Sequence, residues 1–130
     1  METEAKARIL IVDDEPDLVK LLQSYLKRLG YSVDTSHDAE EALALVDQTG
    51  QTYDLLVADV TLPRMSGKEL ALKMTAASPN LKVLLTSGYP VAVDSMPESL
   101  RYRLGSLDKP FLPNMLVKSI EELLQRPNKK

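Results

Sequence analysis

The chain has 130 residues, 44% of them apolar, which fits one globular domain with a hydrophobic core. It has no cysteine, which excludes disulfides and thiolate metal sites, and no apolar run long enough to span a bilayer. The net charge of −3 gives no field that favours nucleic acid, and the charged N-terminal residues lack a signal-peptide core. We therefore expect a single cytoplasmic domain over residues 1–130, with its core at about 8–125, that contacts neither DNA nor a membrane directly.

Short apolar runs alternate with amphipathic stretches along the first half of the chain. The run Arg8–Val12 predicts a strand, and leucines at helical spacing over 18–29 predict a helix that ends at Gly30. Ser32–Thr35 predicts a weak second strand. A capping box that begins at Asp38 predicts a second helix, whose inner face is formed by small and aliphatic side chains.

The second half repeats this alternation. Its expected elements are, in order, a strand, a helix, a strand, a helix, a strand and a helix: Leu55–Ala58, Leu70–Ala77, Lys82–Thr86, Tyr89–Leu104, Ser106–Leu107 and Pro113–Gln125. The fourth of the five expected helices should be short or irregular, because Pro90 and Pro97 interrupt it. Leu112 is a poor N-cap for the last helix, although Pro113 favours a helix start there.

Repeated strand–helix alternation predicts an α/β fold, in which helices cover both faces of a parallel sheet. The carboxyl ends of parallel strands meet at one edge of such a sheet, and ligands bind at that edge. Polar residues stand at four of these expected strand ends: Asp13, Asp14, Asp59, Ser87 and Lys109. We therefore expect their side chains to lie close together.

This combination of residue types indicates phosphoryl chemistry on a carboxylate. Three neighbouring carboxylates repel one another and require a cation, and hard oxygen ligands suit Mg²⁺. Lys109 adds a fixed positive charge, so Asp59 can act as a nucleophile toward phosphorus while the Ser87 hydroxyl binds a phosphoryl oxygen. Taken alone, an Asp-Asp pair is usually a helix-capping loop and a Lys-Pro pair a turn. Their coincidence at successive strand ends favours the aspartyl phosphate interpretation.

The sequence at these positions resembles the receiver domain of bacterial two-component response regulators. Four blocks carry the resemblance: ILIVDDEP (Ile9–Pro16), YDLLVADVTLPRMSG (Tyr53–Gly67), VLLTSGYP (Val83–Pro90) and LDKPF (Leu107–Phe111). The last two blocks are also similar to receivers attached to hybrid sensor kinases. The resemblance implies a flavodoxin-like, doubly wound sheet of five parallel strands in the order 2-1-3-4-5, with five helices.

The resemblance implies a role for each site residue. Asp59 would be the phosphoacceptor, Ser87 the hydroxyl that follows the phosphoryl group, and Lys109 its ion-pairing lysine. The phosphoryl donor would be a histidine kinase or a histidine phosphotransfer protein. The domain would be a signalling phosphoacceptor that changes conformation, rather than an enzyme, although it can catalyse its own phosphorylation and dephosphorylation. It can also form a phosphorylation-dependent dimer.

The same resemblance implies the ligands of a Mg²⁺ cofactor. Asp14 and Asp59 would bind the ion directly, Asp13 mostly through water, and the carbonyl of Thr61 would be a further ligand. Gly67 matches the position at which the loop after the acceptor turns into the third helix.

Two positions depart from the family pattern. Ser106, three residues before Lys109, replaces an aromatic residue that swings inward in many relatives, so we expect a weaker conformational readout at the fifth strand. Tyr89, two residues after Ser87, is bulky. It either restricts attacking water and lengthens the phosphoryl lifetime, or is an exposed residue of a partner-binding loop.

Two other interpretations compete with a phosphorylated receiver. A phosphohydrolase of the haloacid dehalogenase type needs a second Asp two residues after the nucleophile, where this chain has Thr61. A degenerate receiver would act as a phosphorylation-independent interaction module. Such domains usually lose an acidic residue or the lysine, whereas this chain keeps all of them. The phosphorylated receiver is therefore favoured, and the degenerate receiver is kept as the alternative.

Overall fold

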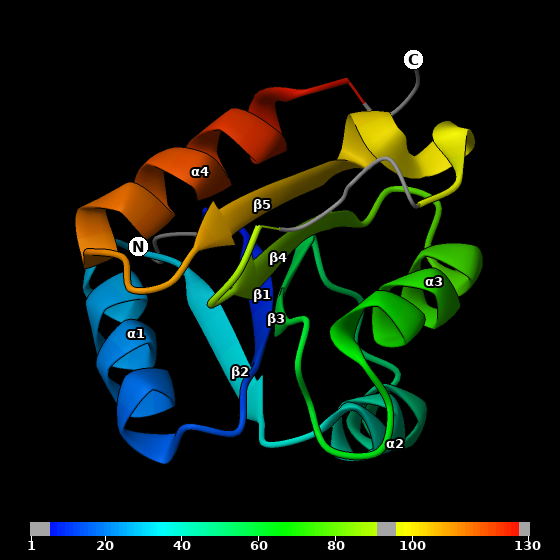
Figure 1. Cartoon of the computed structure of the whole chain (residues 1–130), viewed down its shortest axis with the longest axis horizontal. Helices are drawn as coiled ribbons and strands as arrows, with labels where there is room; N and C mark the ends of the chain where they lie inside the picture. The colour runs from blue at the N-terminus through cyan, green and yellow to red at the C-terminus, as the bar shows by residue number, and fades with distance from the viewer. Residues whose placement is uncertain (1–5, 91–95, 128–130) are drawn as a thin grey trace, which may run out of the picture.

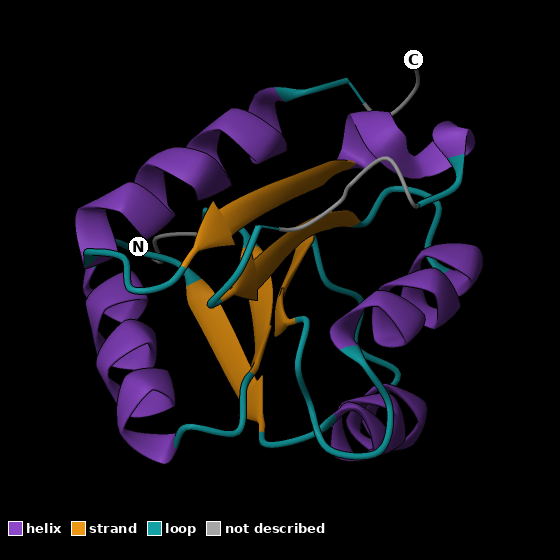
Figure 2. Cartoon of the chain, viewed as in Figure 1, coloured by secondary structure: helices purple, strands orange, loops and turns teal. Residues whose placement is uncertain are grey.

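The computed structural model describes residues 6–90 and 96–127, which form a parallel sheet between two layers of helices (Figures 1 and 2). The strands are β1 (Arg8–Val12), β2 (Ser32–Ser36), β3 (Leu55–Asp59), β4 (Lys82–Ser87) and β5 (Leu104–Asp108). The helices are α1 (Pro16–Arg28), α2 (Ala39–Thr49), α3 (Gly67–Ala77) and α4 (Pro113–Gln125), with a 3-10 helix, η2 (Glu98–Arg103). The spatial order β2-β1-β3-β4-β5, with every pair parallel, confirms the predicted α/β topology.

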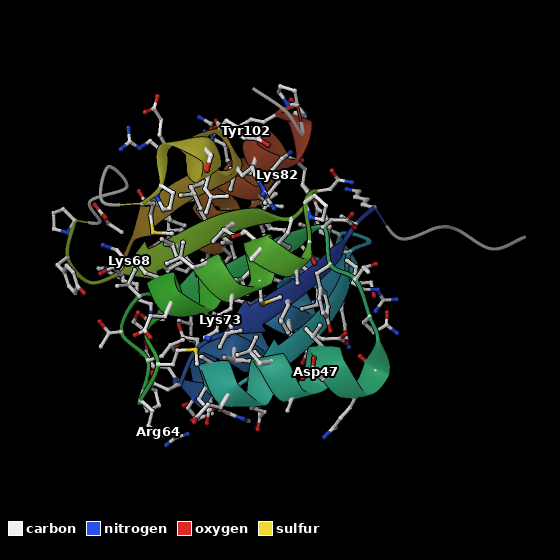
Figure 3. All side chains as sticks on the ribbon, turned by 90° about the vertical axis from the view of Figure 1, so that its right-hand side faces the viewer. Asp47, Arg64, Lys68, Lys73, Lys82 and Tyr102 are labelled. Carbon is white, nitrogen blue, oxygen red and sulfur yellow. The ribbon has the colours of Figure 1, made fainter. Side chains whose placement is uncertain are left out.

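The first and last α-helices form one layer, and the second and third α-helices form the other. Helices α1 and α4 cover one face of the sheet, and α2 and α3 cover the other (Figure 1). Figure 3 shows the second layer from outside, with α3, which carries Lys73, beside α2, which carries Asp47. Both faces of the central strands are therefore buried, as a parallel sheet requires.

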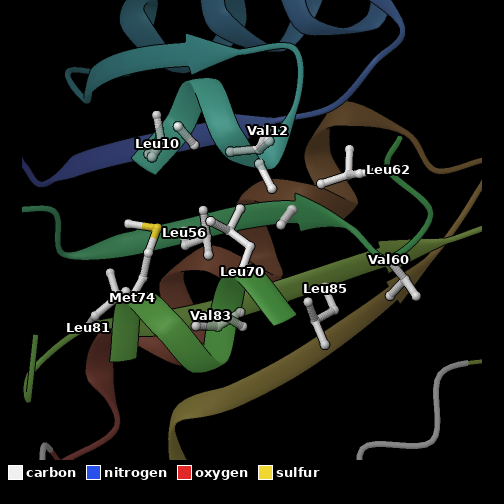
Figure 4. Close-up of a cluster of buried hydrophobic side chains, with 14 of the residues drawn as sticks. Leu10, Val12, Leu56, Val60, Leu62, Leu70, Met74, Leu81, Val83 and Leu85 are labelled. Atoms are coloured by element: carbon white, nitrogen blue, oxygen red, sulfur yellow. The ribbon is translucent and has the colours of Figure 1, made fainter. Parts of the chain in front are cut away.

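The hydrophobic core consists of two clusters, one on each face of the sheet. Along β3, Leu56 and Ala58 point into the cluster beneath α2 and α3, whereas the alternate residues Leu55 and Val57 point to the opposite face. Figure 4 shows Leu56 close to Leu70 of α3. This alternation fixes which face each residue of β3 presents and therefore the register of the strand in the sheet.

The fourth helix has the irregular form that its prolines predict. It is the 3-10 helix η2, which begins after Pro97 and ends where β5 starts. Residues 91–95 of the predicted helical region lie outside the described residues. No helix in the described ranges combines the length and apolar character needed to cross a bilayer.

Strand β5 is longer than the sequence predicts. It covers Leu104–Asp108 rather than Ser106–Leu107 alone, because β4 pairs with it over five positions, from Val83 opposite Leu104 to Ser87 opposite Asp108. Gly105 and Ser106 are weak strand formers, so this strand depends on its neighbour rather than on its own propensity.

The buried face of α1 includes only some of the leucines whose spacing predicts the helix. Leu22 and Leu26 are buried as expected, but Leu21 is 54% exposed, and Val19 lies in the core instead. The helix ends at Arg28, two residues before Gly30, whose φ of +102° reverses the chain toward β2. The spacing of the leucines therefore locates the helix correctly but does not by itself identify the residues that it buries.

The N-cap of α2 forms half of the predicted capping box. The Asp38 side chain accepts a hydrogen bond from the Glu41 N–H at 2.7 Å. The Glu41 carboxylate accepts from the N–H of His37 at 2.9 Å, one residue earlier than a capping box requires. At α4, Leu112 makes no side-chain cap, as expected.

Three cations lie at the amino end of β4 and β5, on the side of the sheet away from Asp59. Lys82 Nζ donates to the carbonyls of Leu123 and Arg126, at 3.1 and 2.7 Å. Arg103 donates to the carbonyls of Ser78 and Leu81. The Arg126 guanidinium in turn donates to the Leu104 carbonyl at 2.9 Å. These cations bind carbonyls at or shortly after the C-terminal ends of α3, α4 and η2.

Candidate functional site

The predicted site residues meet at the carboxyl edge of the sheet. Asp13 directly follows β1, Asp59 is the last residue of β3, Ser87 is the last residue of β4, and Lys109 directly follows β5. The register aligns these ends, because Asp59 is opposite Thr86 and Ser87 is opposite Asp108. Topology alone therefore brings together residues that are up to 96 positions apart in the sequence.

Three carboxylates form the centre of the site. Asp13, Asp14 and Asp59 each offer a carboxylate oxygen, and these oxygens lie within 4.8 Å of one another. Asp13 and Asp59 are buried, whereas Asp14 is exposed at the mouth of the cluster. A group of hard oxygen donors with one open side fits Mg²⁺, which keeps several of its waters when it binds to proteins.

Lys109 neutralises part of this negative charge. Its Nζ lies 2.8 Å from Asp13 Oδ2, 2.9 Å from Asp59 Oδ2 and 2.7 Å from Glu15 Oε2. Its backbone N–H donates to the Ser87 carbonyl at 2.6 Å, which ties the loop after β5 to the end of β4. Three carboxylates therefore share a single ammonium group, and exposed Asp14 adds a fourth negative charge beside Asp13 and Asp59.

Burial and this crowding shift two pKa values in the site. Burial raises the pKa of Asp13 above its ordinary value, and hydrogen bonds from Lys109 and from the Glu15 N–H only partly oppose the shift. Burial also acts to lower the pKa of Lys109, but hydrogen bonds to Asp13, Glu15 and Asp59 outweigh it and raise that pKa. Lys109 therefore stays protonated, while the negative charge of Asp13 is costly in the folded protein.

Backbone N–H groups fix the orientation of the two buried carboxylates. Asp59 Oδ1 accepts from the Thr61 N–H at 2.9 Å, and Asp13 Oδ1 accepts from the Glu15 N–H at 2.9 Å. Each carboxylate thus accepts a hydrogen bond from a backbone N–H with one oxygen and from Lys109 with the other. Neither can rotate without losing a charge-assisted hydrogen bond.

Ser87 and Tyr89 border the acceptor on the β4 side. Ser87 is fully buried, and its Oγ accepts from the Tyr89 N–H at 3.1 Å. Tyr89 is 54% exposed, and its hydroxyl lies 3.5 Å from Thr61 Oγ1. The loops after β3 and β4 therefore approach each other beside Asp59.

Gly67 allows a close contact beneath the acceptor. A Cβ atom at this position would lie 2.2 Å from the carbonyl oxygen of Asp59, and the Gly67 N–H donates to the Val60 carbonyl at 3.0 Å. The glycine is thus required by the close approach of α3 to β3, rather than by an unusual φ. Ser66 caps the same helix by accepting from the Glu69 N–H, a cap that the sequence analysis missed.

The structure brings most of the predicted residues into direct contact. Asp13, Asp59 and Lys109 are hydrogen-bonded, and Asp14 and Thr61 adjoin them, whereas Ser87 is bonded to the Tyr89 N–H. The sequence analysis missed Glu15, whose carboxylate makes the shortest contact with Lys109. Its position directly after the Asp-Asp pair is the one signal that could have indicated it.

The comparisons with known proteins agree on one family. The model of the response regulator receiver domain matches residues 9–121. The response regulator receiver protein CpdR of Brucella abortus is 35% identical over 118 residues, which cover 90% of this chain and 96% of CpdR. The solved structure of response regulator protein TrrA from Thermotoga maritima, in complex with Mg(2+)-BeF, is 32% identical with a TM-score of 0.73. That alignment covers 89% of this chain and 97% of that chain.

Many of the matching proteins are longer than this chain. The sensor kinase CckA of Brucella abortus is 30% identical over 131 residues, which cover 96% of this chain but 13% of the kinase. The chain spans about half the length of several other curated relatives, which are transcriptional regulators. The matched region in all of them corresponds to nearly the whole of the present sheet and its helices.

Proposed function

The chain belongs to the family of response regulator receiver domains, and on that premise we propose that it accepts a phosphoryl group on Asp59 in a two-component phosphorelay. One observation carries the proposal: the buried carboxylate of Asp59 lies between a lysine ammonium at 2.9 Å and two further aspartates at the edge of the sheet. We place this exchange in the cytoplasm. The phosphoryl donor is a histidine kinase or a histidine phosphotransfer protein.

The chemistry is an in-line displacement at phosphorus. An oxygen of the Asp59 carboxylate forms the new O–P bond while the N–P bond of the donor phosphohistidine breaks, and the electron pair stays on the imidazole nitrogen. The Thr61 N–H and Lys109 hold the two oxygens of Asp59, so the nucleophile is oriented before the donor arrives. Lys109 then neutralises charge on the transferred group.

Asp13, Asp14 and Asp59, with the Thr61 carbonyl, would hold Mg²⁺ beside the acceptor. When bound, the ion would supply positive charge to the phosphoryl oxygens. The Ser87 hydroxyl now accepts from the Tyr89 N–H and still has its own proton to donate. It would donate a hydrogen bond to a phosphoryl oxygen and draw the loop after β4 toward the site.

The signal is a change of conformation around the new group. Movement of Ser87 and Lys109 shifts the ends of β4 and β5, and partners or a second copy of the domain would recognise that edge. Ser106 is exposed on β5, and its small side chain supports a weaker readout at this strand than an aromatic residue gives. The domain thus acts as a phosphoacceptor that catalyses only its own phosphorylation and dephosphorylation.

The degenerate receiver is less well supported as a function. A module that binds partners without phosphorylation has no need for three clustered carboxylates, whose mutual repulsion costs stability. Binding of Mg²⁺ in solution separates the two functions, because the degenerate module should fail to bind the ion.

Intact mass after incubation with Mg²⁺ and acetyl phosphate tests the proposal. The wild type should gain one phosphoryl group, and hydroxylamine should remove it, because hydroxylamine cleaves an acyl phosphate but leaves a phosphoester. Asp59→Ala should gain nothing. Asp47→Asn, which removes a carboxylate from the exposed face of α2, should be phosphorylated like the wild type. A wild type that folds but gains no mass would contradict the proposal and favour the degenerate module.

A further inference from the structure

All the donors of Lys109 are already in use. A lysine ammonium carries three N–H donors and no acceptor. Its Nζ contacts three carboxylate oxygens, those of Asp13, Glu15 and Asp59, at 2.7 to 2.9 Å. A phosphoryl oxygen on Asp59 would be a fourth acceptor. One of the present contacts must therefore break before Lys109 can bind the transferred group.

Glu15 is the contact that breaks at the lowest cost. The Asp13 side chain is 5% exposed and also holds the Glu15 N–H, so it is fixed in place. Asp59 carries the phosphoryl group and remains beside Lys109. The Glu15 side chain, by contrast, is 59% exposed, so its carboxylate is hydrated as soon as it leaves. Hydration of the released carboxylate makes this ion pair less costly to separate than the pairs of Lys109 with buried Asp13 and Asp59.

Glu15 also occupies a position where a different residue would serve the local structure better. It is the N-cap of α1, where Ser, Thr, Asp or Asn usually accepts a hydrogen bond from the first turn. The Glu15 side chain makes no capping bond and reaches instead to Lys109, 94 residues away in the sequence. A residue that omits the local cap for a distant contact at the site indicates a role in that site.

We infer that Glu15 competes with the phosphoryl group for Lys109 and thereby sets how strongly the site holds that group. The inference rests on the proposed function of the same site. Glu15 acts as a positioning residue: it occupies Lys109 in the free protein, and after release its charge repels the anionic phosphoryl group nearby. Both effects have the same sign, so removal of the Glu15 charge strengthens phosphoryl binding.

The affinity for beryllofluoride at saturating Mg²⁺, measured by calorimetry, tests this competition. Glu15→Gln keeps the size of the side chain but removes its charge, and should bind beryllofluoride about two- to tenfold more tightly than the wild type. Asp17→Asn removes the same charge from an exposed position two residues further along α1, and its affinity should equal that of the wild type. Urea unfolding of all three proteins checks that the fold is retained.

Carbon-13 NMR of the side-chain carboxylates supplies a readout that a purely structural ion pair would not give. In the wild type, beryllofluoride should shift the Glu15 carboxyl resonance toward that of a solvated glutamate. Equal affinity of Glu15→Gln and the wild type, or weaker binding by the variant, would overturn the competition while leaving the proposed function intact. A wild type that binds no beryllofluoride at all would instead contradict the proposed function, and the competition with it.

Discussion

The two ends of the strands carry buried charge in opposite ways. At the carboxyl edge, Asp13 and Asp59 share one lysine with Glu15, and Asp14 adds a further negative charge that Lys109 does not contact. At the amino edge of β4 and β5, the described cations bind uncharged backbone carbonyls instead. Those carbonyls lie at the ends of α4 and η2 and in the loop that leads from α3 to β4. The carboxyl edge is therefore left with excess negative charge, whereas the cations at the amino edge have their hydrogen-bond acceptors within the protein.

This difference separates a binding site from a structural contact. A buried cation that satisfies carbonyl groups stabilises the fold and needs nothing from solution. A carboxylate cluster with too few cations costs stability, and in the proposed function the binding of Mg²⁺ would offset that cost. Substitutions that remove a charge should therefore have different consequences at the two edges: lost stability at the amino edge and lost binding at the carboxyl edge.

The substitution with the largest expected effect on stability adds volume at the carboxyl edge and changes no charge. Gly67→Ala would place a methyl group against the carbonyl of Asp59, and backbone cannot move aside as a flexible side chain can. We expect a loss of about 3 kcal/mol or more in the free energy of unfolding, measured in urea. Gly88→Ala is the matched control, since a Cβ there meets nothing within 4 Å. Equal stability of the two variants would show that the loop after β3 is free to shift.

Arg103→Met should give the next largest effect and acts on the amino edge alone. Arg103 is 5% exposed, and its loss leaves the carbonyls of Ser78 and Leu81 without a charged donor. We expect the free energy of unfolding to fall by about 2–3 kcal/mol, with Mg²⁺ affinity unchanged. Lys20→Met, on the exposed side of α1, should change stability by less than about 0.5 kcal/mol. A fall in Mg²⁺ affinity in Arg103→Met would contradict the separation of the two edges.

Asp13→Asn, at the carboxyl edge, should lower the affinity for Mg²⁺ without lowering stability. Burial raises the pKa of Asp13, so its ionised form is disfavoured by folding, and the neutral amide removes that penalty. Stability at neutral pH should match or exceed that of the wild type, while Mg²⁺ affinity falls about 10- to 100-fold. Calorimetric titration with Mg²⁺ and urea unfolding measure the two quantities. A variant that is clearly less stable would show that the Lys109 contact outweighs the cost of burying the charge.

The sequence predicted the carboxyl edge better than any other part of the molecule. Asp13, Asp59 and Lys109 each stand at the end of an apolar run, and parallel topology then brings such residues together without any knowledge of side-chain packing. The prediction needed only the strand ends, and these were correct to within one residue at β3 and β4. The α/β fold followed from the same alternation of runs.

The amino edge and Glu15 could not be predicted in this way. Lys82 and Arg103 look like ordinary surface cations in the sequence, but each is buried against backbone carbonyls of segments distant in the chain. Glu15 depends on how a long side chain is oriented after α1 has formed. Strand β5 likewise takes its length from its pairing with β4 rather than from its own residues. Contacts that depend on packing between distant elements have no local signal.

Substitution of Tyr89 tests whether the carboxyl edge also limits the access of water to the phosphoryl group. Its hydroxyl lies 3.5 Å from Thr61 Oγ1, so the ring is held beside the acceptor while its N–H engages Ser87. Tyr89→Ala should speed the loss of the phosphoryl group by about two- to fivefold, equivalent to roughly 0.5–1 kcal/mol in the barrier. Intact mass followed over time after removal of acetyl phosphate gives the rate.

Tyr89→Phe divides this effect between the ring and the hydroxyl. If the ring excludes water, Phe should retain the slow rate of the wild type, whereas a role for the contact with Thr61 would make Phe resemble Ala. No difference between Ala and the wild type would remove the shielding role altogether. The exposed ring of Tyr89 would then be assigned to a partner-binding loop, and the lifetime of the phosphoryl group would depend on the charges around Lys109 alone.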